Sequence, residues 1–313
     1  MPKFLHELDG AKELFNLIAD EKQLLPAVVE KDYWIMHCLW GLQKSGLQFE
    51  MKGGTSLSKG WGVVDRFSED IDIRFDAPAA LNPKGDKPVH IAARFAFYDD
   101  LAARITMNGI VAERNRGYDD PKAQNGGISL KYRSHFPSTS KLNPEVLLEV
   151  GFDKTAPNEP RDFGSWALER AQERKVDVID NRAFGVKCFN PEYTFVDKLQ
   201  TICRRFRQHR DRNDPDKDKP QFFLRHYYDL YMLLDVPRVR AFIGTDEYEA
   251  YKKQKLMTTD AAEFATRAAF TLEDSESYAL FEQEFQVMNA MLTPPRPKFA
   301  DVMVRIRERA PRL

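Results

Sequence analysis

Two short stretches of the chain carry residue types that could together bind a phosphate chain and a divalent cation. The first, Gly53-Gly54-Thr55-Ser56, follows a predicted strand and precedes a predicted short helix. A glycine pair lets the backbone approach a phosphate closely. Two hydroxyls and the first amides of a helix are hydrogen-bond donors that favour an anion. The stretch therefore predicts a phosphate cradle.

The second stretch holds two aspartates, Asp70 and Asp72, in a segment where charged and apolar residues alternate as in a strand. Residues i and i+2 of a strand point to the same side, so the two carboxylates project together. Two like charges side by side are unfavourable unless a cation lies between them. Mg²⁺ takes one or two carboxylates and completes its shell with water and phosphate oxygens. A phosphate cradle beside such a pair is the equipment of two-metal nucleotidyl transfer.

Each stretch alone has an ordinary structural explanation, and the order of the two favours function. A single Gly-Gly-Thr-Ser is more often a turn than a phosphate site. An isolated Asp-x-Asp on a strand usually faces solvent. Here the glycines and the aspartates occur in strand–turn–helix–strand order. We therefore interpret them as parts of one site.

The composition excludes several classes of protein. Of the 313 residues, 42% are hydrophobic, which is enough for a sizeable core. The 47 Lys and Arg nearly balance the 48 Asp and Glu, which argues against a polycation that coats nucleic acid but not against a local basic patch. The sequence shows no membrane-spanning run, no signal-peptide pattern and no zinc-site spacing among its three Cys and six His. We expect a soluble cytoplasmic protein.

The hydrophobic pattern changes along the chain and predicts two domains, an α/β domain over 1–183 and a helical C-terminal domain over 184–313. In the first, we expect helices at 5–18, 27–44, 91–107 and 166–175, and strands at 47–51, 71–75, 127–133 and 146–152. The turn formers of 153–164 predict a loop. In the second, we expect helices that begin at 191 and then cover 222–234, 246–256, 260–271, 278–292 and 301–309.

These stretches resemble a known family. Gly-Gly-Thr/Ser followed by Asp-x-Asp resembles the signature of the DNA polymerase beta-like nucleotidyltransferase superfamily. The fuller patterns Gly53–Lys59 and Arg66–Asp72 resemble its AbiEii/AbiGii toxin branch, the toxins of type IV toxin–antitoxin and abortive-infection systems. Three further segments agree in order, Glu30–Tyr33, Thr194–Leu199 and Arg225–Leu230. The resemblance implies a nucleotidyltransferase-type mixed sheet flanked by helices, with a helical C-terminal domain.

The resemblance also implies a role for each matching residue. Asp70 and Asp72 would hold two Mg²⁺ ions and take part in catalysis, and Lys198 and Asp229 are carried over as a second catalytic pair. The residues that would bind the NTP are Gly53, Gly54, Thr55, Ser56, Lys59 and Arg225.

A third metal carboxylate is usual in this superfamily, and Glu149 is our candidate for it. Glu149 lies inside the apolar strand predicted at 146–152, where a charge without a partner is costly. Asp153, just beyond this strand, is the alternative.

Several of these residues also have structural explanations. Lys198 borders the apolar face of its helix, so its amino group either reaches a cleft or extends past the edge of the core. Arg225 and Asp229 are four residues apart, which also fits a surface ion pair on a helix. The arginine-rich run 204–212 either contacts an RNA backbone or is a solvated helix end.

The resemblance implies a function for the whole chain. It predicts a toxin that transfers a nucleoside monophosphate from an NTP to an acceptor hydroxyl, a tRNA 3′ end, with release of pyrophosphate. The implied partners are the NTP, the RNA acceptor and an antitoxin encoded nearby that acts without a stable complex; no membrane partner is expected. Two alternatives stay open: transfer to a hydroxyl of a protein or a small molecule, and RNA binding without catalysis.

Overall fold

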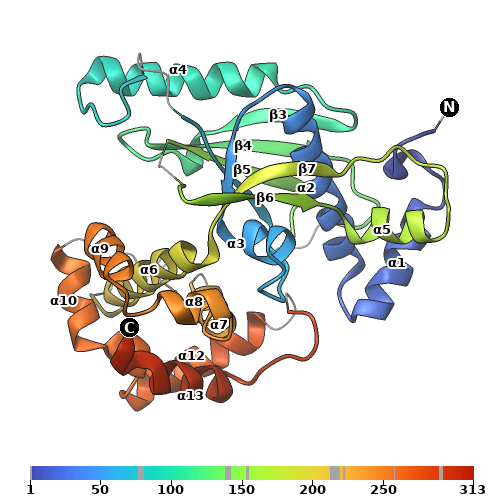
Figure 1. Ribbon diagram of the computed structural model, residues 1–313. Coiled ribbons are helices and arrows are strands. Elements are labelled where there is room, and N and C mark those ends of the chain that lie inside the picture. The colour runs from blue at the N-terminus through green and yellow to red at the C-terminus, as the bar shows by residue number, and fades with distance from the viewer. Residues whose placement is uncertain are drawn as a thin grey trace. The chain divides into compact units, whose positions relative to one another are not determined.

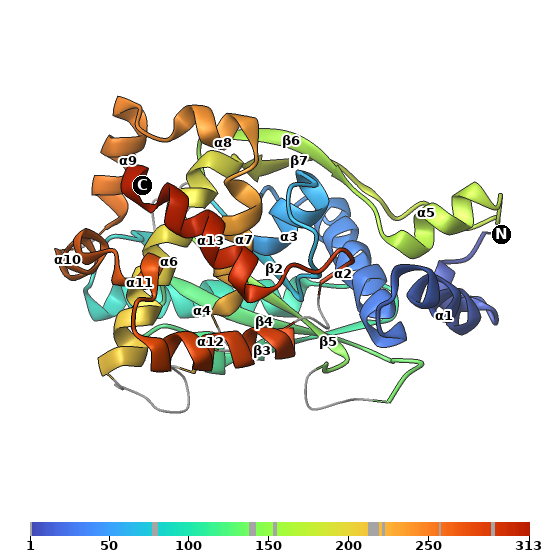
Figure 2. The ribbon, with the colours of Figure 1, turned by 90° about the horizontal axis from the view of Figure 1, so that it is seen from below.

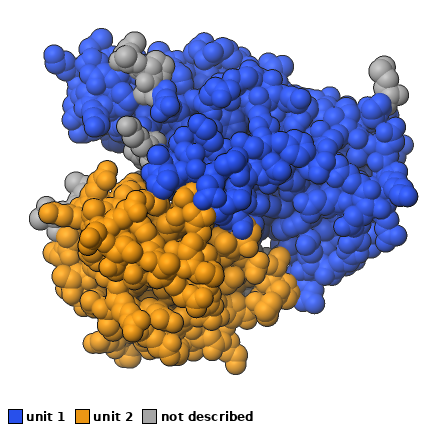
Figure 3. All heavy atoms as spheres, viewed as in Figure 1, with its two compact units in different colours: residues 1–61, 67–189 blue, residues 62–66, 190–313 orange. Residues whose placement is uncertain are grey.

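The chain folds into two compact units, which are coloured separately in Figure 3. Unit 1 contains Met1–Trp61 and Phe67–Phe189, and unit 2 contains Gly62–Arg66 and Asn190–Leu313. A short segment from the middle of the first unit's sequence thus belongs to the second unit. The computed structural model describes residues 2–76, 81–137, 142–152, 155–211, 219–220, 223–256, 258–288 and 292–313.

The observed division of the chain differs from the boundary we predicted after residue 183. Strand β7 (Ala183–Phe189) pairs with β1 (Glu50–Lys52) and with β6 (Asn158–Phe163), so it is part of the sheet of unit 1. Unit 2 resumes at Asn190, directly before the proline that begins its longest helix. The α/β part of the chain therefore extends to residue 189.

Unit 1 is built on a mixed sheet, in which the described residues form seven strands in the order β3-β4-β5-β2-β1-β7-β6 (Figure 1). β2 (Asp70–Arg74) is antiparallel to β1 and parallel to β5 (Glu145–Gly151). β4 (Asn125–Tyr132) lies between β5 and β3 (Ile110–Asn115) and is antiparallel to both. The predicted α/β class, a mixed sheet flanked by helices, is confirmed.

Helices cover one face of this sheet. The helices of unit 1 are α1 (Ala11–Lys22), α2 (Pro26–Lys44), α3 (Gly53–Thr55) with its continuation Ser56–Gly60, α4 (Pro88–Arg104) and α5 (Trp166–Glu173). α2 packs on β5, β2 and β7, and α4 packs on β3 and β4. Tyr98 of α4 lies against Gly126, the register partner of Val150. Because strand side chains alternate, Glu149 and its register partner Asp72 point to the opposite face.

Three strands lie where the sequence pattern predicts none. β6 falls in the segment 153–164 that we expected to be a loop, and β3 and β6 form the two edges of the sheet. An edge strand pairs on one side only, so it tolerates polar residues and a proline such as Pro160. β7 was not predicted because its large apolar residue Phe184 is exposed and because Gly185, with a φ of 65°, interrupts the alternating pattern of a strand.

Unit 2 is helical in its described part (Figure 2). Its helices are α6 (Pro191–Asp211), α7 (Leu224–Leu233), α8 (Pro237–Phe242), α9 (Asp246–Lys255), α10 (Thr258–Thr266), α11 (Ala268–Thr271), α12 (Ser275–Met288) and α13 (Phe299–Arg309). Rings of Phe223, Tyr227, Phe281 and Phe299 contact one another in its core.

Two predicted helices are interrupted. The helix expected at 260–271 is split into α10 and α11 by Arg267, whose φ of 58° is left-handed. The helix expected at 5–18 begins only at Ala11, after a single 3₁₀ turn at Leu5–Glu7. Among the described residues, no helix is long and apolar enough to cross a membrane.

Candidate active site

The sheet brings the three predicted metal carboxylates to one face. Asp72 of β2 is the register partner of Glu149 in β5, and Asp70 lies two residues before Asp72 on the same side. The neighbouring charge of Asp72, then burial and the charge of Asp70, raise the pKa of Glu149 to about 8. The carboxylates therefore form a row of mutually repelling groups, which a cation would stabilise.

The carboxylate row, by which we mean Asp70, Asp72 and Glu149, suits a hard divalent cation. Carboxylate oxygens are the ligands that Mg²⁺ prefers, and one or two of them suffice when phosphate and water complete the shell. Among the described residues, no three His, Cys, Asp or Glu side chains form a ready-made coordination site. The alternative ligand Asp153 lies outside the described residues.

The predicted phosphate cradle begins where β1 ends. Gly53 has a φ of 80°, and a Cβ atom at this position would lie 2.0 Å from Oδ2 of Asp72. Only glycine therefore fits between the start of α3 and the carboxylate row. The Gly53–Thr55 helix continues as a π-helical turn to Gly60, and its first amides have no partner within the helix.

The two hydroxyls of the cradle have different surroundings. The Thr55 hydroxyl donates a 2.5 Å hydrogen bond to the carbonyl oxygen of Asp70, which ties the cradle to the carboxylate row. The Ser56 side chain is buried and lies beside the thiol of Cys188. Thr55 thus positions the cradle relative to the carboxylate row.

Lys59 points to a different partner from the one we expected. We predicted that it faces the phosphates, but its Nζ lies 2.7 Å from Oδ1 of Asp32 and 4.1 Å from the centre of the Trp166 ring. The buried carboxylate of Asp32 also accepts a 2.9 Å hydrogen bond from the backbone amide of Trp166. Lys59 therefore anchors the end of the cradle helix to α2 and α5.

Two further residues of the Glu30–Tyr33 segment bind parts of the site's framework. Lys31 donates to Glu69, directly before Asp70, at 2.7 Å. Glu30 is fully buried and accepts 2.9 and 2.7 Å hydrogen bonds from the backbone and ring nitrogens of His135. The sequence resemblance marked these residues but gave them no role; their buried charges on α2 were the available signal.

In unit 2, Lys198 and Asp229 form an ion pair. Lys198 Nζ lies 2.9 Å from Oδ2 of Asp229 and 3.2 Å from Nδ1 of His226. Arg66 also binds Asp229, with Nε 2.6 Å from Oδ1 and a second nitrogen 2.9 Å from Oδ2. Asp229 is fully buried, which excludes a surface pair with the exposed Arg225. No role for Arg66 was predictable from the sequence, since its partner is 163 residues away.

These contacts set the charges of the pair. Burial alone would raise the pKa of Asp229, but Arg66 and then Lys198 outweigh it and hold the pKa well below its usual range. Burial lowers the pKa of Lys198, and the charge of Asp229 opposes this effect. Burial and the charge of Lys198 hold the pKa of His226 well below its usual value. Asp229 is therefore ionised and His226 is neutral.

The arginine-rich run is partly neutralised within unit 2. Arg207 pairs with Asp260 at 3.1 Å, and Arg210 pairs with Glu263 at 2.8 Å. Arg204 is exposed, and the last arginine of the run, at position 212, lies outside the described residues. The run is therefore less cationic than its sequence suggests.

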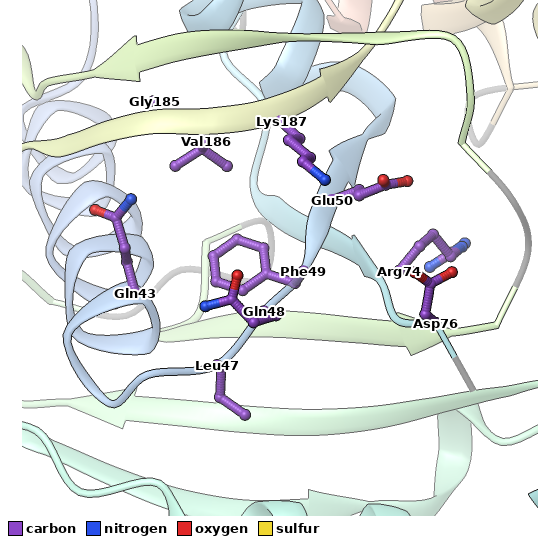
Figure 4. Close-up of a pocket in the computed structure, with 10 residues that line it drawn as sticks. All are labelled: Gln43, Leu47, Gln48, Phe49, Glu50, Arg74, Asp76, Gly185, Val186 and Lys187. Atoms are coloured by element: carbon purple, nitrogen blue, oxygen red, sulfur yellow. The ribbon is translucent and has the colours of Figure 1, made fainter. Parts of the chain in front are cut away.

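A separate pocket of about 250 Å³ lies at the other end of β1 from the cradle (Figure 4). Its charged lining residues carry both signs: Glu50 and Asp76, Arg74 and Lys187. The Glu50 carboxylate is already bound by Asn158 at 2.8 Å. The pocket contains none of the predicted site residues.

Residues 34–305 of the chain match a family model whose description is "Nucleotidyl transferase AbiEii toxin, Type IV TA system". The chain belongs to this family. The suspected AbiEii relationship is thereby confirmed. The match covers the cradle, the carboxylate row, Lys198 and Asp229, whereas the Glu30–Tyr33 segment precedes it. No curated protein matches the chain.

Membership of the AbiEii family establishes the general activity. The family comprises nucleotidyl transferase toxins of type IV toxin–antitoxin systems. It implies an NTP substrate, and a cognate antitoxin as partner.

Proposed function

We propose that this AbiEii protein transfers a nucleoside monophosphate from an NTP to the 3′-terminal hydroxyl of a tRNA and releases pyrophosphate. The observation that carries the proposal is the carboxylate row beside the glycine that begins α3, since a Cβ at Gly53 would collide with Asp72. A phosphate held by the first amides of α3 would meet cations held by the row.

The chain's own residues have distinct tasks in this reaction. Asp70, Asp72 and Glu149 hold two Mg²⁺ ions, and the Gly53–Ser56 cradle holds the triphosphate. The acceptor oxygen attacks the α-phosphorus, the bond from that phosphorus to the bridging oxygen breaks, and pyrophosphate leaves; the hydroxyl proton passes to solvent. Bound Mg²⁺ supplies the positive charge that stabilises the α-phosphate in the transition state.

We propose that Lys198 and Asp229 are required for transfer, and that Arg225 contributes positive charge for the NTP. Support comes from the ion pair itself, because a buried lysine needs a partner to remain charged. Lys59 is assigned a positioning role, since its amino group binds Asp32. The proposed antitoxin is encoded nearby and acts without a stable complex, and the proposed site of action is the cytoplasm.

The proposal is tested by incubating the purified protein with each of the four α-labelled NTPs, Mg²⁺ and total RNA. We expect label in RNA of tRNA length. The label should be absent when the RNA 3′ ends are oxidised with periodate before the incubation, and absent with the Asp70→Ala variant. Equal labelling by Asp70→Ala, or no labelling of any fraction, contradicts it. Label in protein or in small molecules instead would identify a different acceptor.

Growth arrest separates catalysis from RNA binding alone. We expect induction of the wild type to arrest growth and induction of Lys198→Ala or Asp72→Ala to be harmless at equal protein level. Equal arrest by all three proteins would favour a toxin that binds RNA without modifying it.

A further inference from the structure

The sheet fixes a lateral order of groups on the face that carries the carboxylate row. Reading across the strands, Gly53 follows the end of β1, Asp72 is in β2, Glu149 is in β5, and Gly127 of β4 is the register partner of Glu149. Adjacent strands are about 4.8 Å apart, so Gly127 lies about 10 Å from Asp72, on the side away from the cradle. Glycine leaves this position of the face without a side chain.

An exposed tyrosine fills the place above Gly127. A Cβ atom at Gly127 would lie 2.7 Å from Cβ of Tyr118, which belongs to the 3₁₀ turn Arg116–Tyr118 after β3. Tyr118 is 53% exposed, although a large ring would normally be buried where core space exists. Burial, and then the negative charges of Asp70 and Glu149, raise the pKa of Tyr118, which agrees with a ring beside the carboxylate row.

Hydrogen bonds hold the turn that carries Tyr118 against β4. Asn115 donates to Ser129 at 2.9 Å and accepts from the amide of Gly117 at 3.3 Å. Asp119 accepts from the amide of Gly127 at 3.3 Å and forms an ion pair with Arg114 at 2.8 Å. The position of Tyr118 is therefore fixed by contacts on both sides, as expected of a preformed binding surface.

The order of groups across the sheet places the Tyr118 ring on the side of the row opposite the cradle. Phosphoryl transfer places the attacking and leaving oxygens roughly in line on opposite sides of the phosphorus. With the leaving pyrophosphate on the cradle, the attacking hydroxyl approaches from the side of Glu149 and Gly127. The Tyr118 ring would then lie next to the attacking hydroxyl, where the terminal nucleotide of the acceptor binds.

We propose that Tyr118 stacks on the terminal base of the acceptor nucleic acid and so positions its 3′ hydroxyl at the carboxylate row. This inference rests on the proposed function and adds a residue to it. It requires that the acceptor carry a nucleobase at its reacting end, and it separates acceptor binding from NTP binding along the sheet.

The test compares two synthetic RNA hairpins with unpaired 3′ ends, one of normal sequence and one whose terminal nucleotide is abasic but retains its hydroxyls. Tyr118→Ala should raise KM for the normal RNA about tenfold and leave KM for the NTP unchanged. Tyr118→Phe should retain the wild-type KM. With the wild type, the abasic RNA should have a KM raised to the same degree. With Tyr118→Ala, the abasic RNA should have the same KM as the normal RNA.

Phe184→Ala is the matched control, because Phe184 is similarly exposed (50%) but lies on β7, beyond β1 from the row. It should leave both KM values unchanged. Unchanged KM for RNA in Tyr118→Ala, or a rise in KM for the NTP instead, overturns the inference. If the wild type labels no RNA, the proposed function fails, and anisotropy of the same fluorescent hairpins without NTP still tests the contact: equal Kd for wild type and Tyr118→Ala overturns it.

Discussion

At the residue scale, the carboxylates of this protein lie in two opposite electrostatic surroundings. Glu149 is surrounded by acids, which raise its pKa to about 8. Asp229 is surrounded by Arg66 and Lys198, which hold its pKa below the usual range. The first arrangement is unfavourable until a cation binds, whereas the second is complete within unit 2. Glu149 and Asp229 therefore differ in charge state: burial among acids favours a protonated Glu149, and the two cations keep Asp229 ionised.

Asp229→Ala should destabilise the protein by about 3–5 kcal/mol, because it leaves the buried Arg66 and Lys198 without their shared anion. Urea unfolding at pH 7 measures the change. Glu113→Ala is the control, since the Lys131–Glu113 pair is about half exposed on both sides and should contribute under about 1 kcal/mol. A loss below about 1 kcal/mol in Asp229→Ala would contradict the assignment.

The same variant has a defined pH dependence. A depressed pKa in the folded state stabilises the protein above the unfolded-state pKa of about 4 and ceases to do so as pH falls below it. The difference in unfolding free energy between wild type and Asp229→Ala should therefore be constant near neutral pH and shrink below about pH 4. A difference that grows on acidification would contradict the ion pair.

Gly53→Ala should reduce transfer at least about 100-fold, because the new methyl group would displace the Asp72 carboxylate. Gly46→Ala is a matched control: Gly46 also has a left-handed φ, of 81°, but open space around the Cβ position. Both variants should lose about 1–2 kcal/mol of stability from backbone strain. Equal activity of the two variants would remove the steric argument.

The placement of the site's glycines and aspartates was predictable from a short stretch of sequence. Their spacing alone indicates that the glycines follow a strand and that the two aspartates share a face. The partners of Lys59 and Arg66 were not predictable in this way. Lys59 binds Asp32, and Arg66 binds Asp229, across long stretches of sequence. Only the fold brings such residues together.

At the element scale, α2 is the anchor of unit 1. Its polar residues bind the cradle helix, the residue before Asp70 and the segment after β4, through Asp32, Lys31 and Glu30. It also binds the turn before β3 and the segment before β7 through His37, which lies 2.9 Å from the carbonyl of Asn108 and 3.0 Å from the side chain of Asn181. A helix that was predicted as amphipathic thus buries charged residues as well.

His37 should make the protein sensitive to mild acid. Burial lowers the pKa of His37 to about 4, so the unfolded chain takes up a proton below pH 6.5 that the folded chain does not. Stability is therefore lost as pH falls from 6.5 to 4, by at most about 3 kcal/mol from this group. His37→Gln should flatten this slope in urea unfolding series; an unchanged slope would assign the effect to other groups.

Whether a segment is a helix or a strand was predictable from the period of its hydrophobic residues, as in β2, β5 and α7. The edge strands β3 and β6 did not follow, because a strand paired on one side has little apolar pattern. The end of the α/β part was also misplaced, since β7 reads as an irregular segment until its pairing with β1 is known.

At the scale of the whole molecule, the chain cannot be divided by a single cut. Unit 2 includes Gly62–Arg66, and this segment supplies Arg66 for Asp229 as well as a backbone pairing between Arg66 and Leu292. The amide of Thr293 and the hydroxyl of Tyr228 also bind the carbonyl of Asp65, both at 3.2 Å. Unit 2 is therefore incomplete without residues from within the sequence of unit 1.

A fragment of residues 190–313 should accordingly fail to fold cooperatively, since it lacks Arg66 and leaves the Lys198–Asp229 pair incomplete. Circular dichroism during thermal unfolding measures this. A fragment that begins at 190 but carries 62–66 on a flexible N-terminal linker should recover part of the transition. A cooperative transition of the short fragment near that of the full chain would contradict the structural role of this segment.

The net charge of −1 leaves room for the proposed contact with one end of an RNA. Acids gather at the carboxylate row, and Arg207 and Arg210 are paired within unit 2. Composition alone excluded a protein that coats nucleic acid. Which charges are paired could be seen only from the fold.

Nucleotidyl transfer by this protein should depend on divalent cations held at the carboxylate row. The most direct measurement compares the rate of label transfer from α-labelled NTP to RNA for wild type, Asp72→Asn and Asp76→Asn, with Mg²⁺ and with EDTA. Asp76 is an exposed aspartate just past the end of β2 and serves as the matched control. We predict wild-type transfer by Asp76→Asn, and none by Asp72→Asn or in EDTA. Full transfer by Asp72→Asn, or full transfer in EDTA, would contradict the claim.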